Sequence, residues 1–192
     1  MARPKTFDPD TAVHQAMDVF WTNGYAGTTP QQLVDALGIG RGSLYNAFES
    51  KHGLYERALR HYRKTETARL LEALDAPGPA RARIRAALRL VVDAALADDQ
   101  RRGCLAANAA VEFADRDDTV NMLVRRIFDE QERAFRDTIK EGQRAGEIAA
   151  DLDAGALAAF LLATINGIRV LAKADPDPQR LGGLAETALR AL

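Results

Sequence analysis

Hydrophobic residues recur at helical spacing in one segment of the chain after another. Near the N-terminus they repeat at intervals of three and four residues, at Val13, Ala16, Met17 and Phe20. This period marks the buried face of an amphipathic helix. Asp8 is suited to cap such a helix and Pro9 to occupy its first position. The pattern predicts a first helix that begins after Asp8 and ends near Gly24.

The same period continues to the C-terminus, interrupted by residues that cap or break helices. Runs of β-branched residues, which favour strands, are scarce. Further helices are expected from Ser50 to about Asp75, from shortly after Pro79 to the break at Arg101–Gly103, from Cys104 to Ala114, from about Asp117 to Gly142, from Asp153 to about Ala174, and over Leu181–Leu189. The chain is therefore expected to be all-α.

Two very short helices joined by a glycine-containing turn are the most informative local pattern. Thr29 is suited to cap the first of them, Pro30 fits its first position, and Gln32 completes a capping box with Thr29. Gly38 can close that helix in the left-handed conformation, and the next two residues form the turn. Short helices connected in this way are typical of a helix-turn-helix.

The second short helix has an apolar face and a polar face. Leu44 and Phe48, four residues apart, are expected to point into the core. A single helix fits the major groove of B-DNA, where base edges are exposed. The candidate DNA contacts on or beside this helix are Thr28, Thr29, Arg41, Gly42, Ser43, Tyr45, Asn46 and Lys51.

Three of these side chains have the chemistry to contact base edges. Arg41 could form two hydrogen bonds with a guanine or could bind a phosphate, and the sequence leaves both open. Asn46 could bind an adenine or a phosphate. Ser43 can donate to a base edge or to a phosphate, and Gly42 beside it lets the helix approach the DNA closely.

Other residues of this region are suited to phosphate groups. Lys51 begins the next helix, and its ammonium group together with free backbone N–H groups could hold a phosphate. Thr28 and Thr29 could do the same at the start of the first short helix. The N-terminal Arg3 and Lys5 could reach a minor groove or a phosphate, as homeodomain arms do, or belong to an unstructured tail.

These stretches resemble the DNA-binding domain of TetR/AcrR-type regulators. The resemblance is carried at fixed spacing by Gly-Tyr-Ala-Gly-Thr-Thr (24–29), Leu-Gly-Ile-Gly-Arg-Gly-Ser-Leu-Tyr-Asn-Ala-Phe (37–48) and Ser-Lys-His-Gly-Leu-Tyr (50–55). It implies a homodimeric transcription factor, usually a repressor, whose C-terminal helices bind a small-molecule inducer. It also implies that Tyr45 donates a hydrogen bond to a DNA phosphate. Ala47 departs from the bulkier residue of many relatives, which puts a base contact from that position in doubt.

Two domains are predicted, a helix-turn-helix DNA-binding domain over residues 1–52 and a larger helical effector-binding and dimerisation domain over 53–192. The strongest break, Pro77–Pro79, is expected to separate helices inside the second domain, because the apolar period resumes at Ile84. The last two helices could pack within one chain or pair across a two-fold axis as a four-helix bundle. We expect the homodimer, since palindromic operators match two-fold proteins.

Composition agrees with a folded protein but does not by itself indicate nucleic acid. The 192 residues are 47% hydrophobic and 28% charged, which argues against disorder. The formal net charge is -1, and residues 1–60 hold equal numbers of basic and acidic side chains. So few cations per subunit predict modest non-specific affinity for double-stranded DNA and a dependence of binding on dimerisation.

Several function classes lack their sequence signatures. The single cysteine, Cys104, permits neither an intramolecular disulfide nor a paired-cysteine zinc site. The three histidines are scattered, and the common motifs of hydrolases, nucleotide-binding enzymes and metalloproteases are missing. The N-terminus lacks the apolar core of a signal peptide. The sequence shows no run of about 18 apolar residues that could span a bilayer. We expect a cytoplasmic protein without cofactor, metal or membrane partner, and not an enzyme.

The second half does not specify a ligand. Residues that could line a pocket of mixed polarity are Tyr62, Asn108, Glu112, Phe113, Met122, Phe128, Asn166 and Arg169. Each of them, taken singly, is better explained as a rim or packing residue. The identity of the inducer therefore stays undetermined at the level of sequence.

Cys104 is the candidate for a chemical sensor. It follows Arg101 and Arg102 and begins a predicted helix, and both cationic neighbours and helix N-termini favour a reactive thiolate. The stretches 103–105 and 167–173 are similar to the electrophile-sensing repressor group of N-ethylmaleimide reductase. That resemblance implies a switch formed by Cys104 and Lys173. A small buried structural cysteine is the alternative.

Two other function classes remain as alternatives. A helical protein-interaction adaptor without DNA binding would agree with the near-neutral charge, and a thiol-dependent enzyme would use Cys104. The dependence of DNA affinity on salt separates the adaptor from a DNA-binding protein, because phosphate contacts release counterions.

Overall fold

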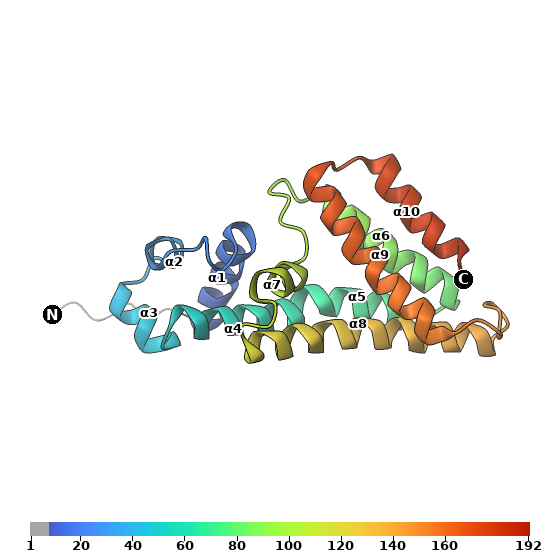
Figure 1. Cartoon of the computed structure of the whole chain (residues 1–192), viewed down its shortest axis with the longest axis horizontal. Helices are drawn as coiled ribbons and strands as arrows, with labels where there is room; N and C mark the ends of the chain where they lie inside the picture. The colour runs from blue at the N-terminus through green and yellow to red at the C-terminus, as the bar shows by residue number, and fades with distance from the viewer. Residues whose placement is uncertain (1–7) are drawn as a thin grey trace.

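The computed structural model describes residues 8–192, which form an elongated all-helical molecule (Figure 1). The helices of this range are α1 (Pro9–Asn23), α2 (Pro30–Leu37), α3 (Arg41–Phe48), α4 (Lys51–Tyr62), α5 (Ala68–Asp75), α6 (Ala80–Leu96), α7 (Leu105–Phe113), α8 (Asp118–Arg144), α9 (Ala154–Ala174) and α10 (Pro178–Arg190). The expected all-α class is confirmed. The expected contact by Arg3 and Lys5 lies outside the described residues.

The helix starts follow the capping residues seen in the sequence. The Asp8 carboxylate accepts hydrogen bonds from the amides of Asp10 and Thr11 at the start of α1. The Thr29–Gln32 capping box is present at α2, and Gly38 closes that helix with φ 62°, in the left-handed region. The helix-turn-helix of α2 and α3 thus forms as its local sequence dictates.

The helix expected from Ser50 to Asp75 contains an irregularity. A π-helical turn, η1 (Arg63–Thr67), lies between α4 and α5, and the three together form a rod that runs beside α8 (Figure 1). Within η1, Arg63 forms an ion pair with Glu130 of α8, and Thr67 is buried against Gln131. Hydrophobic periodicity does not reveal a single extra residue in a helix, although such bulges are frequent at functional sites.

The break before α7 is longer than expected. Helix α6 ends at Leu96 instead of continuing to Arg101, and the chain forms a loop as far as the cap of α7. The Asp98 carboxylate fixes this loop by accepting from the amide of Arg102 at 2.6 Å and by pairing with its guanidinium at 3.0 Å. The Pro77–Pro79 break does separate two helices, α5 and α6.

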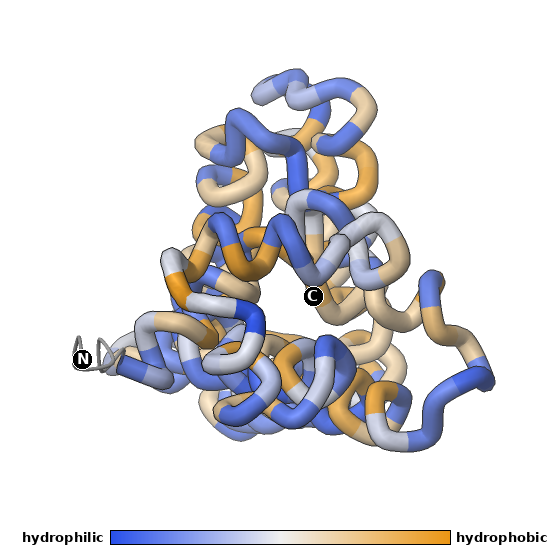
Figure 2. Tube along the Cα trace, turned by 90° about the vertical axis from the view of Figure 1, so that its left-hand side faces the viewer, coloured by the Kyte–Doolittle hydropathy of each residue, from blue (hydrophilic) through white to orange (hydrophobic). Residues whose placement is uncertain are grey.

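Two buried hydrophobic clusters hold the molecule together. One joins α1–α4 to Cys104, α7 and the first half of α8, and the other lies among α5, α6, the second half of α8, α9 and α10. Along the tube in Figure 2, hydrophobic residues recur between hydrophilic ones within each helix, as amphipathic packing requires. The first cluster extends well past residue 52, so the N-terminal helices and part of the second half share one core.

One helix does not agree with the expectation of no membrane-length apolar run. By length and composition alone, α9 is apolar enough to cross a membrane, with a mean hydropathy of 1.7. In the structure it packs against α8, α6 and α10 and contributes to the core with Ala158, Leu161, Ile165 and Ile168. Helix α9 also exposes apolar residues on its outer face, such as Phe160 and Val170. Exposed apolar residues that lie together mark a surface that can pack against a partner.

Candidate DNA interface and effector pocket

Helix α3 presents its polar face to solvent and buries its apolar face. Leu44 and Phe48 are each 1% exposed, whereas Arg41, Ser43 and Asn46 are exposed. The predicted division between core and surface positions of this helix is confirmed. The polar side chains therefore lie on one outward face of a short helix, as contact with a DNA groove requires.

Gly42 has no role in the internal packing. A Cβ atom added there would meet nothing within 4 Å, and the residue is not in the left-handed region of backbone conformation. A glycine inside a helix costs stability relative to alanine. Neither the backbone conformation nor the neighbours within the protein require glycine at this position.

Tyr45 lies at the edge of the polar face of α3. Its ring packs against the first hydrophobic cluster and is partly buried, and the Arg41 guanidinium carbon lies 5.9 Å from the ring centroid. Arg41 itself stays exposed. The Tyr45 ring thus contacts one side of the Arg41 guanidinium, and the other side stays accessible to solvent.

Lys51, at the first position of α4, is held against the loop between α1 and α2. Its ammonium nitrogen lies 4.3 Å from the centroid of the Tyr25 ring. Partial burial lowers the pKa of Lys51, and the nearby Glu112 carboxylate acts in the opposite direction. The first-turn amides of α4 point out of the helix beside this ammonium group.

The two threonines before α2 differ in what they can contact. Thr28 is 1% exposed, and its hydroxyl donates to the carbonyl of Gly24 at 2.7 Å. The expected phosphate contact by the Thr28 side chain is therefore wrong, because the side chain is buried and engaged inside the protein. Thr29 is exposed, and its hydroxyl takes part in the capping box with Gln32.

Helix α7 grips the loop between α1 and α2. The Glu112 carboxylate accepts hydrogen bonds from the amides of Tyr25 and Ala26, at 2.8 and 2.5 Å. Phe113, on the same helix, packs against the rings of Tyr25 and Tyr55 with centroid distances of 5.0 and 5.3 Å. Any displacement of α7 would consequently be transmitted to the loop before α2 and, through Tyr55, to α4.

The loop between α6 and α7 makes a second connection to α1. Arg102 pairs with Asp18 at 3.0 Å, and its guanidinium lies 4.4 Å from the Trp21 ring centroid. The indole N–H of Trp21 donates to the carbonyl of Gly103 at 3.2 Å. Residues 102–104, in the loop and at the cap of α7, therefore connect α1 to the second half of the protein.

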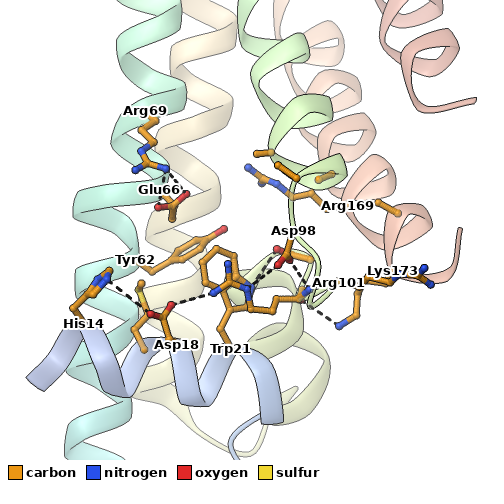
Figure 3. Close-up of a pocket in the computed structure, with 17 residues that line it drawn as sticks. His14, Asp18, Trp21, Tyr62, Glu66, Arg69, Asp98, Arg101, Arg169 and Lys173 are labelled. Carbon is orange, nitrogen blue, oxygen red and sulfur yellow. Dashed lines mark hydrogen bonds and ion pairs between the residues drawn. The ribbon is translucent and has the colours of Figure 1, made fainter. Parts of the chain in front are cut away.

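A pocket of about 400 Å³ opens where these parts meet. Figure 3 shows residues from four places around it: α1 with Asp18 and Trp21, the α4–α5 rod with Tyr62, the loop after α6 with Asp98, and α9 with Arg169. Its volume lies within the range of small-molecule sites. A ligand bound there would touch the DNA-binding helices and the second half together.

Cys104 lies directly beside this pocket but is buried. The side chain is 2% exposed and caps α7 by accepting from the amide of Ala107 at 3.4 Å. The hydroxyl of Tyr62 donates to the sulfur at 3.4 Å. Burial raises the pKa of Tyr62, and the Cys104 thiol adds to this effect, whereas Arg169 opposes it. Tyr62 therefore keeps its proton and remains a hydrogen-bond donor.

Lys173, the expected partner of Cys104, lies at the rim of the pocket. Its ammonium group donates to the carbonyl of Arg102 at 3.3 Å, and its side-chain carbons lie against Gly103. A Cβ atom on Gly103, which has φ 74°, would come within 2.8 Å of the Lys173 side chain. Lys173 thus contacts the backbone next to the cysteine, while the sulfur is approached by the Tyr62 hydroxyl, the Ala107 amide and the Arg169 guanidinium.

Comparison with known protein families gives two adjacent matches. The model described as bacterial regulatory proteins, tetR family, matches residues 12–58, and the model described as tetracyclin repressor-like, C-terminal domain, matches residues 80–188. The chain belongs to the TetR family. It is accordingly a DNA-binding helix-turn-helix transcriptional repressor and not an enzyme.

Individual TetR-family proteins align along nearly the whole chain. YezE of Bacillus subtilis (strain 168), an HTH-type transcriptional regulator, is 31% identical over 100% of both chains. The HTH-type repressor ComR of Escherichia coli (strain K12) is 32% identical over 98% of this chain and 90% of its own. The solved structure of a cysteine mutant of the TetR-family regulator CifR, complexed with 26-bp operator DNA, has a TM-score of 0.88 and 38% identity, and covers 98% of this chain and 99% of that one.

Some of the predicted effector residues line the pocket and others lie outside it. Tyr62, Arg169 and Lys173 line the pocket, and Cys104 lies behind Tyr62. Phe113 does not line it, because its ring packs on the DNA-binding helices.

The two asparagines on the candidate list also lie outside the pocket lining. Asn108 donates to the carbonyl of Arg102, and Asn166 donates to a carbonyl of its own helix, that of Leu162. Of the other pocket candidates, Met122 and Phe128 line a separate depression along α8.

Several functional contacts were not found from the sequence. The charges that were expected to act on Cys104 are used elsewhere: Arg102 pairs with Asp98 and Asp18. The sequence makes Glu112 a candidate pocket residue, but in the structure its carboxylate holds the loop before α2. Apart from Asp98, these partners lie more than eighty residues away in the chain, and local periodicity does not bring such distant segments together.

Proposed function

We propose that this TetR-family protein is a cytoplasmic homodimeric repressor that binds a palindromic operator and releases it when an effector occupies the pocket beside Tyr62. The observation that carries the proposal is the outward polar face of α3, built on buried Leu44 and Phe48. The CifR relative was solved with 26-bp operator DNA, at 38% identity to this chain. Contact of α3 with a major groove follows the geometry of helix-turn-helix proteins.

The proposed DNA contacts divide into two kinds. Arg41, Ser43 and Asn46 are exposed on α3 and are assigned to base edges, with a phosphate as the alternative partner of each. Tyr45, Lys51 and Thr29 are assigned to phosphates, which fix the register of the protein on the duplex. Gly42 lets the backbone of α3 come close to the DNA, since a Cβ atom at this position would meet nothing else of the protein within 4 Å.

The proposed dimer interface is the outer face of α9 together with α10. Phe160 and Val170 of α9 are 44% and 56% exposed, and small residues such as Ala156, Ala159 and Ala163 lie exposed on the same helix. Small residues allow two helices to approach closely, and an isologous pair of α9–α10 hairpins would form a four-helix bundle. This arrangement places two α3 helices on one duplex.

The proposed response couples the pocket to the spacing of these helices. An effector between α1, the rod and α9 would shift the 97–104 loop, which contacts α1 through Arg102 and Trp21. Movement of α7 would then act on the loop before α2 through Glu112. The effector must bind the low-affinity state of the dimer more tightly, because only a difference in affinity shifts a two-state equilibrium.

A redox or electrophile response through Cys104 is a second form of this proposal. The thiol lies behind Tyr62 at the pocket, and Lys173 is near the backbone beside it. Serine is a stronger N-cap than cysteine, so Cys104→Ser should preserve α7. We expect the variant to bind the operator normally and to lose release by oxidants or N-ethylmaleimide. Unchanged release in this variant would assign Cys104 to a structural role.

The proposal as a whole is tested by titrating DNA binding against salt. A gel shift with the intergenic DNA upstream of the protein's own gene should give a steep negative slope of log affinity against log salt, because several phosphates are neutralised. Shuffled DNA of equal composition is the control and should bind more weakly. Equal affinity for both sequences, or a flat slope, would contradict an operator-binding function.

A further inference from the structure

The pocket beside Tyr62 contains more positive charge than its own acids neutralise. Its charged lining consists of Arg69, Arg101, Arg102, Arg169 and Lys173 against Asp18, Glu66 and Asp98. The acids already have partners in the lining. Within the described residues, Arg69 pairs with Glu66 at 3.3 Å, and Arg102 pairs with both Asp18 and Asp98 at 3.0 Å.

Arg169 lies deep in the pocket, where burial acts to lower its pKa but Tyr62, Cys104 and Glu66 stabilise its charge and raise the pKa overall, while one nitrogen of its guanidinium lacks a partner among residues 8–192. Its Nη1 atom is buried and has no hydrogen-bond partner among the described residues. Figure 3 shows the side chain extending from α9 towards the region between Tyr62 and Glu66. A buried guanidinium nitrogen without an acceptor costs free energy, and arginine does not lose its charge in proteins. An acceptor that binds from outside would remove this cost.

The neighbours of Arg169 favour a ligand with one anionic end and an apolar body. The Tyr62 hydroxyl donates to the Cys104 sulfur, and Met17, Trp21 and Ala172 supply apolar surface around the same pocket. Carboxylates match the fork of donors that a guanidinium presents. A volume of about 400 Å³ suits a molecule of small size rather than a lipid or a coenzyme.

We infer that the effector of this repressor is a small organic carboxylate, whose carboxylate binds Arg169 while its apolar part lies against Trp21. The inference rests on the proposed effector response and specifies its ligand class. It differs from thiol modification at Cys104, since it requires reversible binding of an anion and no covalent bond.

Matched probes test this inference directly. Benzoate and hexanoate are titrated into the full-length protein by calorimetry, with benzamide and hexanamide as neutral analogues of the same shape. The carboxylates should bind at least about tenfold more tightly than the amides, because a charge-assisted hydrogen-bonded pair is lost in the amide. Equal affinity of the two series, or no measurable binding of either carboxylate, would overturn the inference.

Two variants place the site. Arg169→Met keeps the length of the side chain and removes its charge, and it should abolish the preference for carboxylates while the melting temperature of the ligand-free protein is unchanged or raised. Arg126→Met, an exposed position of α8 outside this pocket, is the control and should bind like the wild type. Carboxylate preference that survives in Arg169→Met would overturn the assignment.

A parallel measurement separates this inference from the proposed function. Operator binding of the wild type is followed by fluorescence anisotropy with and without hexanoate. Operator binding that is specific and reversed by hexanoate supports both. Specific binding that no carboxylate reverses overturns the ligand class alone, whereas a lack of specific DNA binding overturns the proposed function, whatever the calorimetry shows.

Discussion

At the scale of single residues, the side chains of α3 separate cleanly by physical role. Leu44 and Phe48 hold the helix on the core, and their burial could be predicted from their spacing. Arg41 and Asn46 are exposed, and the Arg41 guanidinium lies over the Tyr45 ring. Because the buried face of α3 fixes the helix, its exposed polar residues can be selected for contact with a binding partner.

Gly42 gives the sharpest prediction at this scale. Gly42→Ala should raise the free energy of unfolding by up to about 1 kcal/mol, because alanine is the better helix former and its Cβ atom meets nothing within 4 Å. The same variant should bind the operator at least about tenfold more weakly, since the added methyl group faces the DNA. Chemical denaturation and gel shift measure the two effects, and operator affinity equal to that of the wild type would contradict close approach at Gly42.

Arg41 and Tyr45 should respond differently to substitution. Arg41→Ala should cost about 1 to 3 kcal/mol on the preferred operator and relax the preference at one base position. Tyr45→Phe should weaken binding to all sequences similarly, because a phosphate contact carries no sequence information. Affinities for a set of single-base operator variants distinguish the two patterns. An unchanged base preference in Arg41→Ala would assign Arg41 to a phosphate.

At the scale of helices, most boundaries could be predicted from capping residues and apolar spacing. The capping box of α2, the cap of α1 and the closing Gly38 occupy their expected places. The π-helical turn η1 and the early end of α6 could not be predicted. Both depend on contacts with distant segments, such as that of Arg63 with Glu130, and local sequence does not encode those.

The link between α7 and the loop before α2 leads to a prediction about stability. Glu112→Gln keeps the shape of the side chain but replaces two charge-assisted hydrogen bonds to the amides of Tyr25 and Ala26 by neutral ones. We expect a loss of about 1 kcal/mol in the free energy of unfolding and faster amide hydrogen exchange at these two residues. Glu72→Gln, on an exposed face of α5, is the matched control. Unchanged exchange at Tyr25 and Ala26 would show that this contact does not hold the loop.

At the scale of the whole molecule, the sequence indicated a DNA-binding half and an effector half but not how they join. The two halves share one hydrophobic cluster, which runs from α1 through Tyr62 and Cys104 to Ile127. The pocket lies at this junction, so its lining comes from α1, the rod, a loop and α9 together. Of the effector candidates, Tyr62 on the rod and Arg169 and Lys173 on α9 reach the pocket, because their side chains point to this junction.

Dimerisation through α9 gives the prediction at this scale. Phe160→Glu should convert the dimer to a monomer, because a charge would be buried against its own copy across the two-fold axis. Light scattering after gel filtration at micromolar concentration measures this. Val111→Glu, at a position of α7 that is 84% exposed, is the control and should remain dimeric. A Phe160→Glu protein that stays dimeric would move the interface elsewhere.

The central claim is that two copies of α3 contact one palindromic operator. Its most direct test is selection of bound DNA from a random double-stranded library, with wild type and Arg41→Ala in parallel. The wild type should enrich two inverted half-sites whose centres lie about one helical turn apart, ~34–36 Å, and Arg41→Ala should lose preference at one symmetric pair of positions. Enrichment of an asymmetric motif, or of no motif, by the wild type would contradict the account.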